Sequence, residues 1–147
     1  VRLGNTNETA PVTLRSSRLL AAARTFCDQH LELLTSADQG KTWDQLGPVT
    51  LGCQHPAHLL QLRDDRVLLT YGIRNKGLYG VGARISRDEG KTWEPPRVLV
   101  DFEIASDGGY PASVQFDDGT ILTAYYANAT PGHQRYHMGV IRWCVDE

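Results

Sequence analysis

One eight-residue pattern, Ser-x-Asp-x-Gly-x-Thr-Trp, occurs twice in this sequence and limits the folds that the chain can adopt. Its copies span residues 36–43 and 86–93, fifty residues apart, and six of the eight positions are identical. A period of this length indicates an array of supersecondary units, each of which needs its neighbours to bury its apolar face.

The pattern also predicts the local geometry of each copy. Ser and Asp side chains accept hydrogen bonds from backbone N–H groups a residue or two further on, which closes a turn. Gly adopts a positive φ that other residues resist. Thr and Trp then begin the next strand, where the indole can pack against the neighbouring unit. Each copy is therefore predicted to be the turn of a β-hairpin.

This pattern resembles the Asp-box of the sialidase (neuraminidase) superfamily, whose members are BNR-repeat β-propellers. Short strands at even spacing, with one aromatic turn motif per unit, are also typical of propeller blades. We therefore predict an all-β chain of about three sialidase-like β-propeller blades, a partial or half propeller. Residues 1–147 would form a single domain with blades at 8–52, 53–103 and 107–145. In the family the box lies remote from the active site, so its residues are not catalytic candidates.

The two ends of the chain predict an incomplete ring. Residues 1–10 are polar and are predicted to form a loop, with the first repeated strand beginning at Pro11. The last unit stops near Trp143 without a third box or a fourth strand. Residues near Val1–Gly4, from this chain or a partner, are expected to supply that strand. Because an open half-ring exposes strand edges and apolar surface, a homodimer that completes the propeller is one expected assembly.

Composition excludes several other classes of function. The formal net charge of −2 and the absence of a basic run argue against nucleic-acid or anionic-membrane partners. A soluble chain of undetermined localisation is expected, because neither a signal peptide nor an apolar run of about 20 residues is visible. Cys27, Cys53 and Cys144 are too widely spaced for a disulfide framework or a zinc site, and buried or half-buried thiols in strands are expected. No metal or other cofactor is predicted.

The resemblance also implies an active site. Family members bind the substrate carboxylate with three arginines and use a Tyr/Glu pair as nucleophile and base, with an Asp as acid/base. A planar guanidinium binds a carboxylate with two hydrogen bonds, and a neutral Tyr can attack a carbon beside a carboxylate that would repel an anionic nucleophile. Tyr110, which opens the first strand of the last blade, matches the nucleophile; the alternative is a rim tyrosine that packs beside Pro111.

Two arginines match the carboxylate-binding positions. Arg24 and Arg74 each end the second strand of a blade and lie fifty residues apart, as the boxes do. In the family this strand end faces the central funnel and supplies an arginine; the alternative for each is a solvated surface charge. Arg84, nearer the second box, is expected to be structural.

Three residues are candidates for the remaining catalytic roles. Glu8 resembles the Glu of a family Glu-Pro pair, although two residues separate it from Pro11. His55 is the alternative base, with a pKa near neutrality. A histidine at this position would also be compatible with a sugar other than sialic acid as the substrate, or with a β-elimination in which His55 and Tyr110 share the roles of base and acid. A plain hydrogen-bonded role for His55 also stays open. Asp107 could reach the same end of the central funnel as Tyr110, or could simply form a turn.

The function that the resemblance implies is a sialidase-like glycoside hydrolase acting on sialylated or other acidic glycans. The family's acid/base Asp and first arginine belong to blades that this chain does not contain, so the chain alone is expected to be inactive unless missing blades or a partner complete it. The alternative is a non-catalytic propeller module for glycan or protein binding or for self-assembly.

Overall fold

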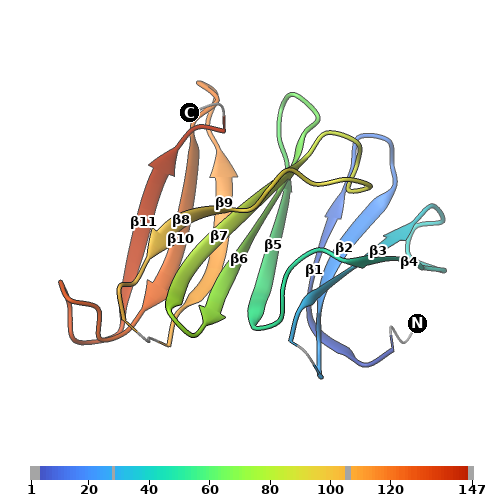
Figure 1. Ribbon diagram of the computed structural model, residues 1–147. Helices are drawn as coiled ribbons and strands as arrows, with labels where there is room; N and C mark the ends of the chain where they lie inside the picture. Colours follow the sequence, from blue (N-terminus) through green and yellow to red (C-terminus); the bar gives the residue numbers. More distant parts are fainter. Residues whose placement is uncertain (1–3, 28, 105–106, 146–147) are drawn as a thin grey trace.

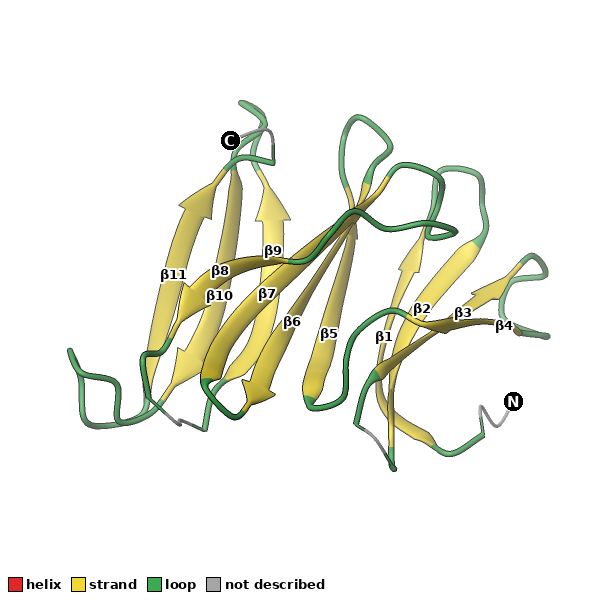
Figure 2. Ribbon diagram, viewed as in Figure 1, coloured by secondary structure: helices red, strands yellow, loops and turns green. Residues whose placement is uncertain are grey.

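A computed structural model describes residues 4–27, 29–104 and 107–145, and these contain eleven β-strands and no helix (Figures 1 and 2). The strands are β1 (Thr6–Thr13), β2 (Leu19–Thr25), β3 (Leu31–Ser36), β4 (Asp44–Pro48), β5 (Gln54–Gln61), β6 (Val67–Asn75), β7 (Leu78–Ser86), β8 (Arg97–Asp101), β9 (Gly109–Gln115), β10 (Ile121–Ala127) and β11 (His137–Trp143). The predicted all-β class is confirmed.

The strands form three antiparallel sheets that follow one another along the chain. The first has the order β1-β2-β3-β4, the second β5-β6-β7-β8, and the third β11-β10-β9. Figure 1 shows the three sheets side by side in chain order. Two four-stranded meanders and a third of three strands confirm the predicted partial propeller.

Both Asp-boxes form the turn that their residues predict. In the second copy, Ser86 Oγ donates to Asp88 Oδ1 at 2.8 Å and accepts from the Gly90 N–H at 2.8 Å. The Asp88 carboxylate accepts from the Thr92 N–H and hydroxyl, and Trp93 Nε1 donates to the Gly90 carbonyl at 3.0 Å. The first copy repeats each bond to within 0.1 Å. The glycine φ angles are 86° and 90°.

A second turn also repeats, and it joins neighbouring sheets. Arg15 donates from its backbone N–H to Gln61 Oε1 at 2.7 Å and pairs with Asp65 of the second sheet. Arg63, at the matching place of that sheet, donates from its N–H to Gln115 Oε1 at 2.9 Å. The same turn therefore links the first sheet to the second and the second to the third.

Some strand boundaries differ from the sequence prediction. The polar segment predicted as a loop instead begins β1 at Thr6, because pairing with β2 satisfies its backbone while its side chains stay largely exposed. The segment predicted as a Gly-rich crossing after β6 is a tight turn at Gly77 (φ 93°), and Gly80 already lies in β7. A Cβ at Gly80 would lie 1.9 Å from the Val100 carbonyl oxygen, so the glycine permits close pairing with β8.

The core lies between the sheets. The first and second sheets bury Leu20, Leu33 and Leu69 between them, and the second and third bury Leu68 and Ile121. The outer face of the third sheet remains open, with exposed side chains that include Val114, Met138 and Val140. The expectation of a partner for this open ring stays a prediction, and Val1–Leu3, part of the segment expected to supply a strand, lie outside the described residues.

The cysteines correct one expectation. Cys27 and Cys53 are exposed and Cys144 is half-buried, and all three lie in loops rather than in strands. Over the described part of the chain, no three His, Cys, Asp or Glu side chains are grouped to hold a metal ion. No helix in the same residues is long and apolar enough to cross a membrane.

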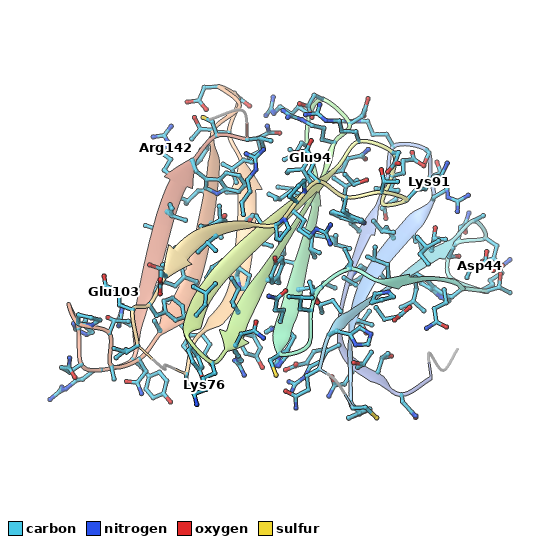
Figure 3. All side chains as sticks on the ribbon, in the orientation of Figure 1. Asp44, Lys76, Lys91, Glu94, Glu103 and Arg142 are labelled. Carbon is cyan, nitrogen blue, oxygen red and sulfur yellow. The ribbon has the colours of Figure 1, made fainter. Side chains whose placement is uncertain are left out.

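The chain directions separate the two ends of the molecule. β1, β5 and β9 begin, and β2, β6 and β10 end, at the lower end in the view of Figure 1. The Asp-boxes follow β3 and β7 at the other end. Lys76, just after β6, and Lys91, inside the second box, mark these opposite ends in Figure 3. The candidate site residues therefore lie away from the boxes.

Candidate active site

The six predicted site residues all come from the strand ends opposite the Asp-boxes. They are Glu8 on β1, Arg24 on β2, His55 on β5, Arg74 on β6, Asp107 in the loop before β9, and Tyr110 on β9. The first strands of the three sheets lie next to one another, with β1 against β5 and β5 against β9. Residues that are up to 102 positions apart in the sequence thereby meet.

Glu8 is the centre of the closest contacts. The Tyr110 hydroxyl donates a hydrogen bond of 2.5 Å to Glu8 Oε1, and Arg24 NH1 pairs with Glu8 Oε2 at 2.7 Å. The side chains of Glu8 and Arg24 are 30% and 21% exposed, so solvent reaches the group only in part. One carboxylate therefore joins the first and third sheets.

The electrostatics of this pair leave the carboxylate charged and the phenol neutral. Partial burial opposes the ionisation of Glu8, but the hydrogen bond from Tyr110 and the Arg24 charge outweigh it and lower the Glu8 pKa. The hydrogen bond to Glu8 raises the pKa of Tyr110, and burial adds to that rise. Near neutral pH the pair is thus a protonated tyrosine facing an ionised carboxylate.

Glu8 and Tyr110 both have unusual backbone conformations. Glu8 has a φ of 31° at a β-bulge where β1 shifts register against β2, and Tyr110 has a φ of 47°. Left-handed conformations of this kind are uncommon for residues other than Gly, and they cluster at functional sites. The bulge redirects the Glu8 side chain.

Two glycines bring the third sheet close to the second at this end. A Cβ on Gly72 of β6 would lie 2.6 Å from the His55 carbonyl oxygen, and one on Gly109 would lie 3.0 Å from the Gly72 Cα. Gly109 also has a φ of 107°. Only glycines allow this approach, and it places Tyr110 beside the end of β6.

Arg74 reaches the tyrosine from the second sheet. Its guanidinium carbon lies 5.7 Å from the centre of the Tyr110 ring, within the range of a cation–π contact. Its NH2 group donates to the Gly108 carbonyl at 3.1 Å and lies 3.7 Å from Asp107 Oδ1. Arg74 Nε is buried and has no hydrogen-bond acceptor among the described residues. This buried N–H is therefore unsatisfied, although the Arg74 side chain as a whole is 26% exposed.

His55 does not have the environment of a base that titrates near neutrality. Burial, together with the charges of Arg24 and Arg74, lowers its pKa to about 4. Its Nε2 lies 3.2 Å from Gln29 Oε1, and its buried Nδ1 has no partner among the described residues. The expected near-neutral pKa is thus wrong, because burial and the positive charges of the two arginines both disfavour a protonated imidazole. The hydrogen-bonded alternative for His55 matches this environment.

Asp107 does more than form a turn. Its Oδ1 accepts from the Tyr126 hydroxyl and its Oδ2 from the Tyr136 hydroxyl, both at 3.0 Å. Sequence reasoning did not select Tyr126, Tyr136 or Gln29 for the site. Tyr126 and its neighbour Tyr125 on β10 are both half-buried.

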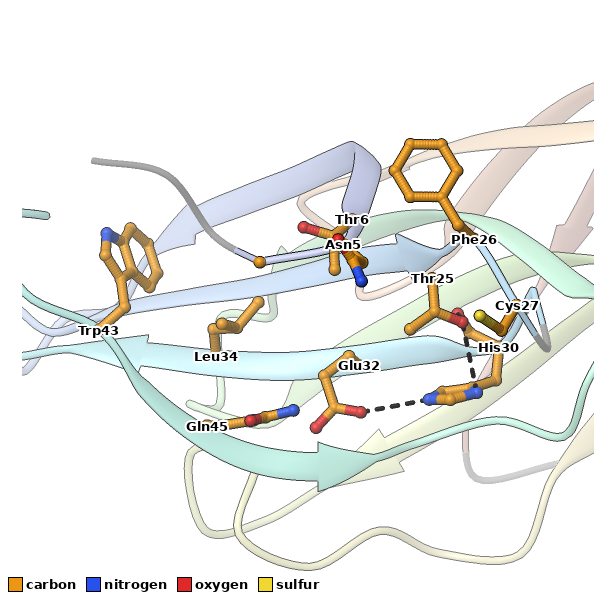
Figure 4. Close-up of a pocket in the computed structure, with 11 residues that line it drawn as sticks. Asn5, Thr6, Thr25, Phe26, Cys27, His30, Glu32, Leu34, Trp43 and Gln45 are labelled. Atoms are coloured by element: carbon orange, nitrogen blue, oxygen red, sulfur yellow. Dashed lines mark hydrogen bonds and ion pairs between the residues drawn. The ribbon is translucent and has the colours of Figure 1, made fainter.

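A hollow on the first sheet lies apart from these residues. It has a volume of about 490 Å³ and is lined by side chains that include Phe26, His30, Glu32, Leu34 and Trp43 (Figure 4). Leu31 and Leu33 face the core, so the alternating Glu32 and Leu34 lie on the opposite face of β3. Because neither Glu8 nor Tyr110 lines this hollow, its size gives it no part in their chemistry.

Comparison with known proteins agrees with this fold. A family model described as "BNR repeat-like domain" matches residues 2–125. A structure of a protein of unknown function from Dyadobacter fermentans DSM 18053 has a TM-score of 0.77 and 34% identity, over 95% of this chain and 38% of that one. The Penicillium chrysogenum α-L-arabinanase complexed with arabinobiose has a TM-score of 0.76 and 16% identity, over 96% and 46%.

A sialidase has the same fold. A mutant of the NanB sialidase from Streptococcus pneumoniae has a TM-score of 0.60 and 18% identity, over 88% of this chain and 20% of that one. None of the curated proteins matches this sequence. The predicted resemblance to Asp-box propellers of the sialidase type is confirmed at the level of fold, and the chain spans less than half of each of these structures.

Proposed function

Because this chain belongs to the BNR repeat-like domain family, we propose that it forms part of the active site of a sialidase-like glycoside hydrolase. Tyr110 is the nucleophile and Glu8 is its base. The observation that carries this proposal is the 2.5 Å hydrogen bond from the Tyr110 hydroxyl to a carboxylate that Arg24 keeps ionised. A nucleophile within hydrogen-bond reach of its base, with a third group orienting the base, is the arrangement that nucleophilic catalysis requires.

The first step is a displacement at the anomeric carbon. The Tyr110 oxygen forms a bond to that carbon, the glycosidic C–O bond breaks with its electrons leaving on the oxygen, and the tyrosine proton moves to Glu8. A neutral phenol is suited to an anomeric carbon that bears a carboxylate, since the substrate charge would repel an anionic nucleophile. Water then forms a bond to the anomeric carbon as the bond between that carbon and the tyrosine oxygen breaks, and Glu8 returns its proton to the departing tyrosine oxygen. The proton that water loses passes through solvent to the oxygen of the leaving group expelled in the first step.

The arginines fit an acidic sugar. Arg74 has a buried Nε without an acceptor, and its guanidinium lies over the Tyr110 ring. The Arg74 side chain as a whole is 26% exposed. A substrate carboxylate could accept from the exposed part of its guanidinium and from Arg24, because a guanidinium can bind a carboxylate with two parallel hydrogen bonds. We therefore propose sialylated or other acidic glycans as the substrate class.

The test uses a substrate that needs no acid to assist its leaving group. The protein in its native, full-length form is incubated with a methylumbelliferyl sialoside, and with a fluorinated sialoside that slows the release of a glycosyl-enzyme. The proposal predicts fluorescence release and a covalent adduct on the Tyr110 peptide in mass spectrometry. Tyr110→Phe should abolish both. Tyr125→Phe, at a tyrosine of β10 that packs against Phe102, is the control and should abolish neither. Full turnover by Tyr110→Phe would refute the nucleophile assignment.

A non-catalytic glycan-binding module is the second candidate. The exposed rings of Tyr110 and Tyr136 favour it, since they offer a surface on which a sugar can stack without any reaction. Under this function the native protein binds glycans in the absence of turnover, and Tyr110→Phe keeps the affinity of the wild type.

A further inference from the structure

A hollow of about 400 Å³ lies where the chain passes from the first sheet to the second. It is bounded by the connection from β4 to β5, by β6 and β7, and by the segment before β8. Its lining side chains include Pro48, Leu51, Tyr71, Arg84 and Pro96. None of the six candidate active-site residues lines it, so the hollow is not part of the site around Tyr110.

Tyr71 brings an unused hydroxyl group to this hollow. The residue is only 1% exposed, and its hydroxyl has no hydrogen-bond partner among the described residues. Its ring fits against Gly82, its pair on β7, where a Cβ would lie 2.8 Å from two of the ring atoms. An unpaired buried hydroxyl costs free energy that Phe at this position would avoid. Packing alone therefore does not account for a tyrosine here.

Arg84 supplies the one positive charge among the residues that line the hollow. Its guanidinium donates to the carbonyl oxygens of Val49, Trp93 and Glu94 at 2.6, 3.2 and 3.0 Å. No carboxylate pairs with it among the residues that the structure describes. Because a guanidinium has five N–H groups, these three bonds fix its orientation and leave both its charge and two donors unmatched.

Tyr71 and Arg84 lie on the same face of the second sheet. Tyr71 pairs with Gly82 and Arg84 pairs with Leu69, so the two side chains are diagonal neighbours on β6 and β7. Burial raises the pKa of Tyr71, and the charge of Arg84 opposes that rise. The phenol is therefore a neutral donor near neutral pH. One positive charge beside one neutral donor suits a singly charged acceptor.

We propose that Tyr71 and Arg84 bind the carboxylate group of a small organic acid that has an apolar body. The Tyr71 hydroxyl and the remaining N–H groups of Arg84 donate to the carboxylate oxygens. The apolar body packs against Pro48, Leu51 and Pro96, and Leu51, which is 71% exposed, gains burial. No acidic side chain lines the hollow to repel the ligand. This site does not depend on the reaction proposed for Tyr110.

The test uses benzoate as the ligand. Benzoate is titrated into the native protein, and saturation-transfer NMR measures its Kd. Tyr71→Phe should raise that Kd roughly tenfold, as expected for a lost hydrogen bond to a charged group. The thermal unfolding midpoint of this variant should be unchanged or higher, because the deleted hydroxyl had no partner. Arg84→Gln should weaken binding further and also lower the midpoint, since backbone carbonyls lose their donors.

Matched ligands and variants complete the test. Benzyl alcohol keeps the ring of benzoate without its charge, acetate keeps the charge without the ring, and both should bind more weakly than benzoate. Tyr79→Phe changes a tyrosine of β7 that does not line the hollow, and Arg142→Gln removes an arginine of the third sheet; both should keep the wild-type Kd.

Three outcomes would overturn the proposal. They are the absence of benzoate binding, an equal Kd for wild type and Tyr71→Phe, and equal binding of benzyl alcohol and benzoate. An equal Kd would mean that benzoate binds elsewhere, as at the arginines near Tyr110. Because no measurement requires turnover, benzoate binding that depends on Tyr71 would stand even in a protein that forms no Tyr110 adduct.

Discussion

The Tyr110 hydroxyl donates a 2.5 Å hydrogen bond to Glu8 Oε1, although 102 residues separate the two in the sequence. The bond crosses from the third sheet to the first. It raises the pKa of Tyr110 and helps to lower that of Glu8.

Replacing the carboxylate should change the tyrosine measurably. Glu8→Gln removes the negative charge that opposes phenolate formation, so the Tyr110 pKa should fall toward the ordinary tyrosine range. Absorbance titration of the variant against wild type and Tyr110→Phe identifies the shifted tyrosine. If Tyr110 acts as the nucleophile, the same substitution should lower kcat by roughly 10²–10⁴, the usual contribution of a general base. An unchanged tyrosine titration would contradict the bond.

The activity should persist well into the acid range. Glu8 must be ionised to accept the proton, and its pKa lies below the usual 4.5, so activity should be lost only as the pH falls below that value. A base at His55 with an ordinary imidazole pKa would instead cause loss near pH 6.5. The kcat/KM profile between pH 4 and pH 8 distinguishes the two, and an inflection near 6.5 that disappears in His55→Gln would assign the base to His55.

The free energy of unfolding should decrease as the pH falls from 6.5 to 4, because of His55. His55 has its pKa lowered from 6.5 to about 4 in the folded protein, so the unfolded chain binds a proton first as the pH falls. Its contribution to stability is full above pH 6.5 and is lost progressively down to pH 4. The shift corresponds to roughly 3 kcal/mol in the free energy of unfolding.

Urea unfolding at several pH values checks this loss. His55→Gln should flatten the slope between pH 6.5 and pH 4, while His58→Gln controls for a second histidine whose pKa burial also lowers. An equal slope in wild type and His55→Gln would rule His55 out as its origin.

The Asp-box should matter for stability and not for chemistry. Ser86 is buried and accepts the Gly90 N–H at 2.8 Å, so Ser86→Ala leaves that donor unpaired. The free energy of unfolding should decrease by about 1–3 kcal/mol. Ser16→Ala in an exposed turn is the matched control. Since the box lies at the opposite end from Tyr110, any turnover by the folded protein should be retained in Ser86→Ala. A variant that folds but has lost turnover would contradict a purely structural role for the box.

The close approach of β6 and β9 should be intolerant of a methyl group. In Gly72→Ala the new Cβ would meet the His55 carbonyl oxygen at 2.6 Å and Gly109 Cα at 3.4 Å, so backbone must move. We expect a loss of about 1–3 kcal/mol in stability and a lower Tyr110 pKa as the bond to Glu8 lengthens. Gly132→Ala, where a Cβ meets nothing within 4 Å, is the control. Equal melting temperatures for the two variants would show that the contact is not tight.

Much of the blade structure could be predicted because its interactions are local. Every hydrogen bond within the Asp-box joins residues no more than four positions apart, so eight residues specify the turn. Arg24 and Arg74 were identifiable for a related reason, since a repeat places equal positions at equal strand ends. The start of β1 was missed because an edge strand can carry polar side chains when its neighbour satisfies its backbone.

The sequence by itself determined the repeat, its hairpin turns and the residue types that a glycosidase of this kind needs. Only the tertiary structure decided which of them meet. Glu8 accepts the hydrogen bond of Tyr110, because β1 and β9 both pack against β5 and a bulge redirects the Glu8 side chain. The low pKa of His55 and the contact of the Arg74 guanidinium with the Tyr110 ring likewise depend on burial and on distances between sheets. Such quantities arise from packing between residues far apart in the chain, for which one sequence carries no local pattern.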